Sequence, residues 1–185
     1  MENQRSGTLA AALELVRGLP RKTAVVAVDG RSSSGKTTLA ARIAAAVPGA
    51  CVVHTDDIAW HHAVLDWAGL LADGVLRPFR SGRDVSYRPP QWDVRGRSGS
   101  IDVPASCPLL LVEGVGSGRR ELSGLLDAVI WVETDAAERD RRDAVRVAAG
   151  ETTPDDYAAW MAEVEPFVAG QRTWERADLI VRGSH

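Results

Sequence analysis

The hydrophobic residues of this chain gather in five short, continuous runs that are separated by longer segments of mixed character. The runs occupy residues 24–28, 50–53, 109–112, 128–132 and 178–181. None of them alternates apolar with polar positions, which is typical of strands covered on both faces. Because helical or irregular segments separate the runs, the pattern predicts an α/β fold in which a parallel sheet lies between layers of helices.

Four segments carry apolar residues at the spacing of an amphipathic helix. They cover residues 6–18, 38–47, 136–149 and 154–169. The start of the last segment carries three helix-start signals: Thr153 as a cap, Pro154 in the first turn and Asp156 three residues after the cap. We expect Pro166 to kink this helix or end it early. Its apolar stripe is expected to pack in the core and consists of Tyr157, Trp160, Met161, Val164 and Val168.

A phosphate-binding motif lies between the first strand and the second helix. Residues 30–37 read Gly-Arg-Ser-Ser-Ser-Gly-Lys-Thr, a complete G-x-x-x-x-G-K-T pattern in the order strand, loop, helix. The main-chain amides of such a loop point inward at a phosphate, and the positive end of the helix adds to their field. We expect Lys36 to reach the β- and γ-phosphates and the Thr37 hydroxyl to ligate Mg²⁺. The residues expected to hold ATP here are Gly30, Ser32, Ser33, Ser34, Gly35, Lys36, Thr37 and Thr38.

Composition narrows the class of protein. A chain of 185 residues suits one domain that buries its own core. Its net charge of −3 does not suggest a nucleic-acid binder, and no apolar run approaches membrane-spanning length. Two cysteines without metal-ligand spacing fit a reduced, cytoplasmic protein. Because 20 of the 22 basic residues are arginine, arginines must be judged by position. Residues 183–185 resemble the start of an expression tag.

Three acids follow or end predicted strands at the edge that should carry the phosphate loop. Asp56 and Asp57 come shortly after the second strand, and Glu113 ends the third. We favour Asp56 over Asp57 as the carboxylate that orients or deprotonates an acceptor hydroxyl, and helix capping by the pair is the alternative. Glu113 is expected beside Mg²⁺, with a solvated loop acid as the alternative. Asp56 is a further candidate for the metal, and His54 is either a neighbour of the site or structural.

The helix over residues 136–149 carries three arginines on one face and alanines on the opposite face. Arg139, Arg142 and Arg146 fit a lid that lays guanidinium groups across ATP, with Arg142 also acting on the transferred phosphoryl group. They fit equally well an ordinary solvated face in an arginine-rich protein.

The segment from residue 58 to 106 is rich in glycine, proline and arginine and starts at the carboxyl end of a strand. Open α/β sheets bind ligands at that edge, so we expect this insertion to recognise the acceptor. A variable surface excursion is the alternative.

Together these motifs resemble the uridine kinase branch of the P-loop nucleoside and nucleotide kinases, which includes phosphoribulokinase-like proteins. The resemblance runs from residue 25 to 181 and is carried by the phosphate loop, Asp56, the segment 111–114 and the segment 131–135 with the arginine-rich helix after it. It implies a three-layer sandwich with five parallel strands in the order 2-3-1-4-5. It also implies that Asp56 is the base, that Glu113 neighbours Mg²⁺ and that Arg139, Arg142 and Arg146 form the lid.

The acceptor segment of that branch has a weaker counterpart in residues 90–93, Pro-Gln-Trp-Asp. This likeness places the acceptor near Asp56, Tyr87, Arg88, Trp92 and Arg97. Trp92 stands where the family has tyrosine, and the lid arginines are spaced differently, so the reaction class transfers better than the substrate.

The sequence therefore predicts a single kinase domain over residues 1–182, with 58–106 as the acceptor-binding insertion and 136–150 as the lid. The expected reaction moves the γ-phosphate of ATP, with Mg²⁺, to a hydroxyl of a small molecule such as a nucleoside. Two alternatives are an already phosphorylated acceptor clamped by arginines of the insertion, and a nucleotide-binding regulator without kinase activity. The expected partners are the small-molecule acceptor and a second copy of the chain in a homodimer.

Overall fold

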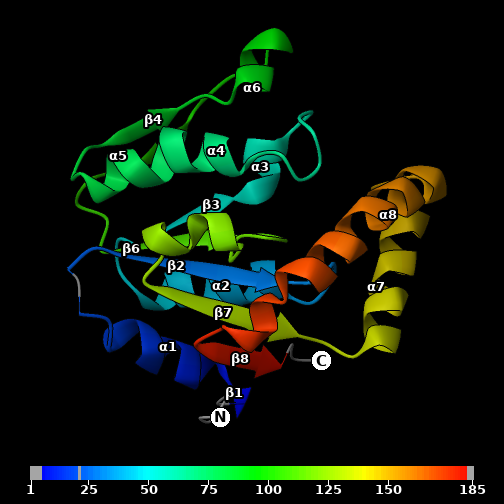
Figure 1. The fold of residues 1–185 in the computed structure, drawn as a ribbon, viewed down its shortest axis with the longest axis horizontal. Helices are drawn as coiled ribbons and strands as arrows, with labels where there is room; N and C mark the ends of the chain where they lie inside the picture. The colour runs from blue at the N-terminus through cyan, green and yellow to red at the C-terminus, as the bar shows by residue number, and fades with distance from the viewer. Residues whose placement is uncertain (1–5, 21, 183–185) are drawn as a thin grey trace.

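The computed structural model describes residues 6–20 and 22–182, so the tag-like residues 183–185 lie outside the described part of the chain. Its main sheet is parallel throughout and has the strand order β1-β8-β7-β2-β6-β3 (Figure 1). The strands are β1 (Ser6–Gly7), β2 (Ala24–Gly30), β3 (Cys51–His54), β6 (Leu109–Glu113), β7 (Ala128–Glu133) and β8 (Leu179–Arg182).

All five predicted strands are present, and their order along the sheet is the expected 2-3-1-4-5. The prediction of a parallel α/β sheet is thereby confirmed. At the N-terminus the prediction was wrong in one detail: the helix expected over residues 6–18 begins at Leu9, because Ser6 and Gly7 pair with Ile180 and Val181 of β8. A backbone ladder to a neighbouring strand replaced the first helical turn.

Two layers cover the sheet, and alternate residues of each central strand face one or the other. Val26 and Leu111 pack in a core cluster with residues of α1 (Leu9–Arg17) and α2 (Lys36–Ala46). Val25 and Leu110 pack in a second cluster with the insertion. Each central strand is therefore buried on both sides, which is why its sequence shows no apolar–polar alternation.

The insertion is a structured layer whose apolar residues contribute much of the core on its side of the sheet. Trp67, Leu71, Val75, Leu76 and Phe79 are all at most 3% exposed. Figure 1 shows this layer beside β3, at one end of the strand order. Its elements are α3 (Thr55–Ala59), α4 (Ala68–Leu71), the π-helical turn η1 (Ala72–Leu76), α5 (Arg77–Arg80), α6 (Pro90–Val94) and the antiparallel pair β4 (Val85–Tyr87) and β5 (Ile101–Val103).

The C-terminal third of the chain adds a helical hairpin. Figure 1 shows α7 (Ala136–Ala148) and α8 (Pro154–Gln171) at the end of the sheet toward which the arrows of β2 and β7 point. The predicted cap is confirmed, since the Asp156 amide donates to the Thr153 hydroxyl at 3.1 Å. An early end at Pro166 was wrong, because the helix continues to Gln171. The described helices include none with both the length and the apolar character needed to cross a membrane.

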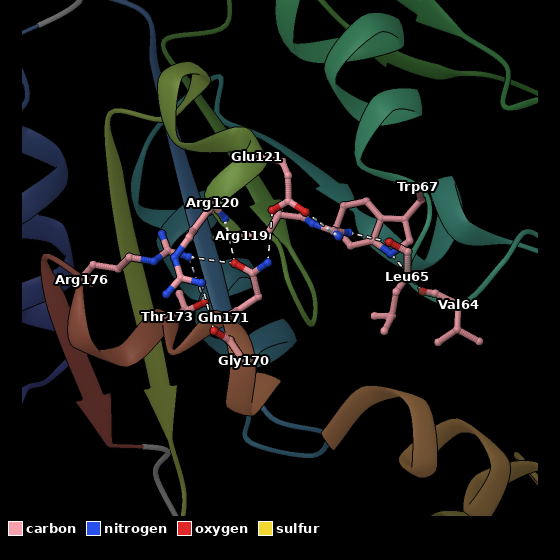
Figure 2. A network of polar contacts seen from close by, with 10 residues as sticks. All are labelled: Val64, Leu65, Trp67, Arg119, Arg120, Glu121, Gly170, Gln171, Thr173 and Arg176. Atoms are coloured by element: carbon pink, nitrogen blue, oxygen red, sulfur yellow. Dashed lines mark hydrogen bonds and ion pairs between the residues drawn. The ribbon is translucent and has the colours of Figure 1, made fainter. Parts of the chain in front are cut away.

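A buried arginine fixes the insertion to the rest of the domain. Arg119, only 6% exposed, lies just before the short helix η2 (Arg120–Leu125) and donates to the Leu65 carbonyl at 2.7 Å and to Glu121 at 3.1 Å. Its guanidinium also lies 5.2 Å from the Trp67 ring. Figure 2 shows this network continuing through Arg120, whose amide donates to the Gln171 side chain at 3.0 Å. The contacts hold the start of the insertion and the end of α8 at defined positions.

Candidate nucleotide-binding site

A cleft of about 1580 Å³ lies at the carboxyl edge of the sheet, where the phosphate loop connects β2 to α2. The structure brings most of the predicted site residues into its wall. Those that line it are Ser32, Ser33, Gly35, Lys36, Thr37, Thr38, Asp56, Glu113, Arg142 and Arg146. Side chains from β3–α3, β6 and α7, distant in sequence, therefore meet around one loop.

Gly30 lets the loop leave the sheet in close contact with the neighbouring strand. Its φ is +154°, and a Cβ at this position would lie 2.5 Å from the Val132 carbonyl oxygen. A side chain is thus excluded by the β7 backbone itself. The loop is further held by Thr134, whose hydroxyl donates to the Ser34 carbonyl at 2.8 Å, while the Ser34 hydroxyl is buried without a hydrogen-bond partner in the structure.

Lys36 carries the positive charge of the loop in a buried position. Its ammonium group donates to the Arg31 carbonyl at 2.7 Å, and the residue is 7% exposed. Burial lowers the pKa of Lys36, while the nearby carboxylates of Glu113, Asp29 and Asp56 act to raise it. An incoming anion strongly stabilises an ammonium group that has lost most of its water.

Asp29, which precedes the loop, is a structural carboxylate that the sequence reasoning did not single out. It is 1% exposed and accepts hydrogen bonds from the amides of Gly30 at 2.7 Å, Gly116 at 2.8 Å and Gly118 at 3.1 Å. Burial raises the pKa of Asp29, and the three amides oppose that effect. The residue ties the first turn of the phosphate loop to the glycine-rich segment after β6.

Glu113, at the end of β6, joins the metal candidate Thr37 to a histidine. The Thr37 hydroxyl donates to one carboxylate oxygen at 3.1 Å, and His54 Nδ1 lies 2.6 Å from the other. The hydrogen bond to Glu113 raises the pKa of His54. His54 therefore holds the carboxylate in place.

A hydroxyl and a carboxylate beside a phosphate loop fit Mg²⁺, which prefers oxygen ligands and keeps several waters. Asp56 lines the same cleft as Thr37 and Glu113. Within residues 6–20 and 22–182, no group of three or more histidine, cysteine or acidic side chains is arranged to hold a metal by itself. The remaining ligands would have to come from phosphate and water, as is usual for Mg²⁺ at nucleotide sites.

The two neighbouring aspartates have different surroundings. Asp56 lines the cleft, and its pKa is raised first by burial and then by the negative charge of Glu113. Asp57 instead forms an ion pair with Arg97, with a distance of 2.5 Å between Oδ1 and Nη2. The choice of Asp56 as the acceptor-side carboxylate stays a prediction.

Two of the three predicted lid arginines face the cleft. Arg142 donates to Glu138 at 2.7 Å and to the Ser33 carbonyl at 3.1 Å, and Arg146 lines the same wall. Arg139 is not among the lining residues, whereas Arg141, which we did not single out, is. The helix is therefore rotated slightly relative to the expected wheel, and the lid role of these residues stays a prediction.

Apart from Asp56, the predicted acceptor residues lie outside the cleft. Trp92 is 4% exposed and donates from its indole nitrogen to the Asp57 carbonyl at 2.9 Å. Arg97 stacks on the Trp92 ring at 3.8 Å, and Arg88 donates to the Arg97 carbonyl at 2.8 Å. Tyr87 lines a separate hollow of about 670 Å³. These side chains hold the insertion together around Asp57, and acceptor binding by them stays a prediction.

The stripe of α8 divides between core and cleft. Val164 and Val168 are buried, as expected. Tyr157 and Trp160 line the cleft. Trp160 also packs against the core cluster that contains Val164 and Val168, so the expectation of core packing was wrong for Tyr157 alone. The signal that could have found them is the polar tip of each ring, which is unusual for a residue meant only to fill a core.

No protein-family model and no curated protein matches the chain, but solved structures do. A possible uridine kinase from Bacillus stearothermophilus is 18% identical, with a TM-score of 0.55, and the match covers 94% of this chain and 96% of that one. A provisionally named fructose transport system kinase from Silicibacter sp. TM1040 is 25% identical, with a TM-score of 0.61 and coverage of 95% and 99%. TT1252 from Thermus thermophilus is 16% identical, with a TM-score of 0.50 and coverage of 89% and 91%.

These likenesses extend over nearly the whole of each chain, and two of the three proteins are named as kinases. The fold is therefore that of the P-loop kinases, and the resemblance to their uridine kinase-like branch is confirmed. The comparisons support a P-loop kinase and leave the acceptor open.

Proposed function

We propose that this protein is a kinase that transfers the γ-phosphate of Mg²⁺–ATP to a hydroxyl of a small, unphosphorylated molecule. The observation that carries this proposal is the meeting of three groups in one cleft. These are a buried Lys36 on the phosphate loop, a Thr37–Glu113 pair suited to a magnesium ion, and Asp56 with a raised pKa.

Each group has a role in phosphoryl transfer. The loop amides and Lys36 hold the β- and γ-phosphates, and Arg142 approaches from the lid side. When bound by Thr37 and Glu113, Mg²⁺ would supply positive charge for the phosphate oxygens. Asp56 accepts the proton of the acceptor hydroxyl while the oxygen of that hydroxyl bonds to the γ-phosphorus. The bond between the γ-phosphorus and the β-phosphate oxygen breaks at the same time, so that ADP leaves.

Arginines of the insertion argue for an acceptor without a phosphate group. A phosphate clamp needs guanidinium groups that are free to form paired hydrogen bonds. Most of these arginines already have partners within the chain. They are Arg77 with Asp73, Arg80 with Asp127 and the Leu125 carbonyl, Arg83 with Ser81, Arg88 with Asp93 and the Arg97 carbonyl, and Arg97 with Asp57. A phosphorylated acceptor would have to break several of these contacts in order to bind.

Nucleosides and free sugars are the acceptor classes that fit this picture, since both offer hydroxyls and carry no phosphate. The two kinases of similar structure are named for uridine and for fructose transport. Asp56 in the cleft would then select whichever hydroxyl lies next to the γ-phosphate.

The experiment is ADP release measured with Mg²⁺–ATP and a panel of nucleosides, sugars, nucleoside monophosphates and sugar phosphates. We expect release to depend on an unphosphorylated acceptor, and we expect Lys36→Ala to abolish it. Release that depends on a phosphorylated acceptor would favour the clamp alternative. Slow release without any acceptor, or nucleotide binding without release, would contradict the proposal.

A further inference from the structure

A buried carboxylate on α7, Asp143, contacts the phosphate loop directly. It is 5% exposed, and one of its oxygens accepts from the hydroxyls of Ser32 at 3.2 Å and Ser33 at 2.5 Å. The other oxygen accepts from the Tyr157 hydroxyl of α8 at 2.6 Å. One side chain thus joins the loop to both helices of the hairpin.

Other contacts make the same connection. Arg31, the second residue of the loop, forms an ion pair with Glu165 of α8. The guanidinium of Arg142 reaches the Ser33 carbonyl at 3.1 Å. The loop is therefore linked to the hairpin through three consecutive residues, Arg31, Ser32 and Ser33.

Within the described residues, Asp143 accepts its hydrogen bonds from hydroxyl groups, although α7 carries several arginines. A buried carboxylate is costly unless its oxygens are hydrogen-bonded, and these three donors satisfy both oxygens. Three arginines of the helix are directed elsewhere: Arg141 to Glu138, Arg142 to Glu138 and Ser33, and Arg146 to Glu151.

Because Arg142 precedes Asp143 on the helix, fixing one sets the rotation of the other. The Arg142 Nη1 atom lies 3.8 Å from the place where a Cβ of Gly35 would stand, which is directly beside the loop amides. If α7 turned or lifted, this guanidinium group would move away from the phosphates.

We propose that Asp143 is a positioning residue that latches the α7–α8 hairpin to the phosphate loop and thereby places Arg142 over the nucleotide phosphates. The effect on turnover rests on the proposed kinase function, whereas the latch itself does not.

The latch is tested first without nucleotide, by amide hydrogen exchange in wild type, Asp143→Ala and Asp143→Asn. We expect Asp143→Ala to speed exchange in residues 30–37 and 136–148 by about tenfold or more, because a locally opened element loses protection. Asp143→Asn should behave like wild type, since its amide oxygen can accept from both serines and its NH₂ can donate to the Tyr157 oxygen. Unchanged exchange in Asp143→Ala would overturn the proposal.

The link to Arg142 is tested by a double-mutant cycle on kcat. We expect Asp143→Ala to lower kcat by about tenfold with little change in KM for the acceptor, and to have almost no further effect in an Arg142→Ala background. Losses that multiply in the double variant would show that Asp143 does not act through Arg142, and would overturn its positioning role.

These experiments distinguish failure of the kinase proposal from failure of the latch proposal. If wild type shows no acceptor-dependent turnover, the kinase proposal fails, and the exchange measurement still decides the latch. If Asp143→Ala does not fold, Tyr157→Phe removes one hydroxyl of the network without disturbing the serines. It should then speed exchange in α7 severalfold, and unchanged exchange would overturn the latch.

Discussion

The close packing of the glycine that follows Glu113 leads to a specific prediction about the stability and activity of the protein. Gly114 has a φ of +142°, and a Cβ there would lie 1.8 Å from the Thr55 hydroxyl oxygen and 2.9 Å from the Thr55 Cβ. Thr55 immediately precedes Asp56 at the start of α3. The close approach therefore joins the strand end that carries Glu113 to the helix that carries Asp56.

Replacing Gly114 by alanine has two costs that can be estimated. A side chain at positive φ costs about 1–2 kcal/mol, and forcing a methyl group into a packed contact costs about 1–3 kcal/mol. We therefore expect Gly114→Ala to lower the free energy of unfolding by about 2–5 kcal/mol. In a domain of this size that corresponds to a Tm lower by about 4–20 °C. Turnover should fall by about 100-fold, because a 1 Å displacement of a catalytic group costs about that much.

Thermal and urea unfolding, together with ADP release, measure these effects. Gly170→Ala is the matched control, since a Cβ there meets nothing within 4 Å in a helical position and should be neutral or stabilising. In Gly114→Ala/Thr55→Ala we expect a smaller loss than the sum of the two single variants, because the methyl group then avoids the threonine hydroxyl. A Gly114→Ala protein with unchanged Tm and full turnover would refute the reasoning.

Further predictions concern the carboxylates and the metal. Asp56→Asn should lower kcat by about 10²–10⁴-fold and leave the ATP affinity nearly unchanged in a binding titration. Asp57→Asn weakens the pair with Arg97 and should keep most of the turnover. Equal losses of turnover in the two variants would contradict the choice of Asp56. Because burial raises the pKa of Asp56, the folded state holds that proton more tightly than the unfolded chain, so its contribution to stability is lost as pH rises through the folded pKa. At neutral pH Asp56→Asn should therefore have a higher Tm than wild type, and a lower Tm of this variant would contradict the reasoning. The kcat of wild type should fall on acidification at a higher pH than an aspartate with an ordinary pKa would give. EDTA should abolish turnover and leave the Tm of the nucleotide-free protein unchanged, because the site supplies few protein ligands; a large drop in Tm would indicate a structural metal.

Local patterns in the sequence were sufficient for the framework of the site. The five strands and the phosphate loop follow from apolar runs and from a motif whose glycines have a steric reason, whereas the order of the strands in the sheet came from the family resemblance. Asp56 and Glu113 could be predicted because the carboxyl ends of parallel strands share one edge. Each of these inferences needs only the neighbours along the chain and the geometry of a parallel sheet.

The tertiary structure decided which polar groups meet across that framework. Asp29 binds the amides of Gly116 and Gly118, 87 and 89 residues away, and Asp143 meets Ser32 and Ser33 from a distant helix. The rotation of α7 placed Arg141 rather than Arg139 at the cleft. Hydrogen bonds between side chains depend on the packing of whole elements to within about an ångström, and residue type and spacing along one chain do not specify that packing.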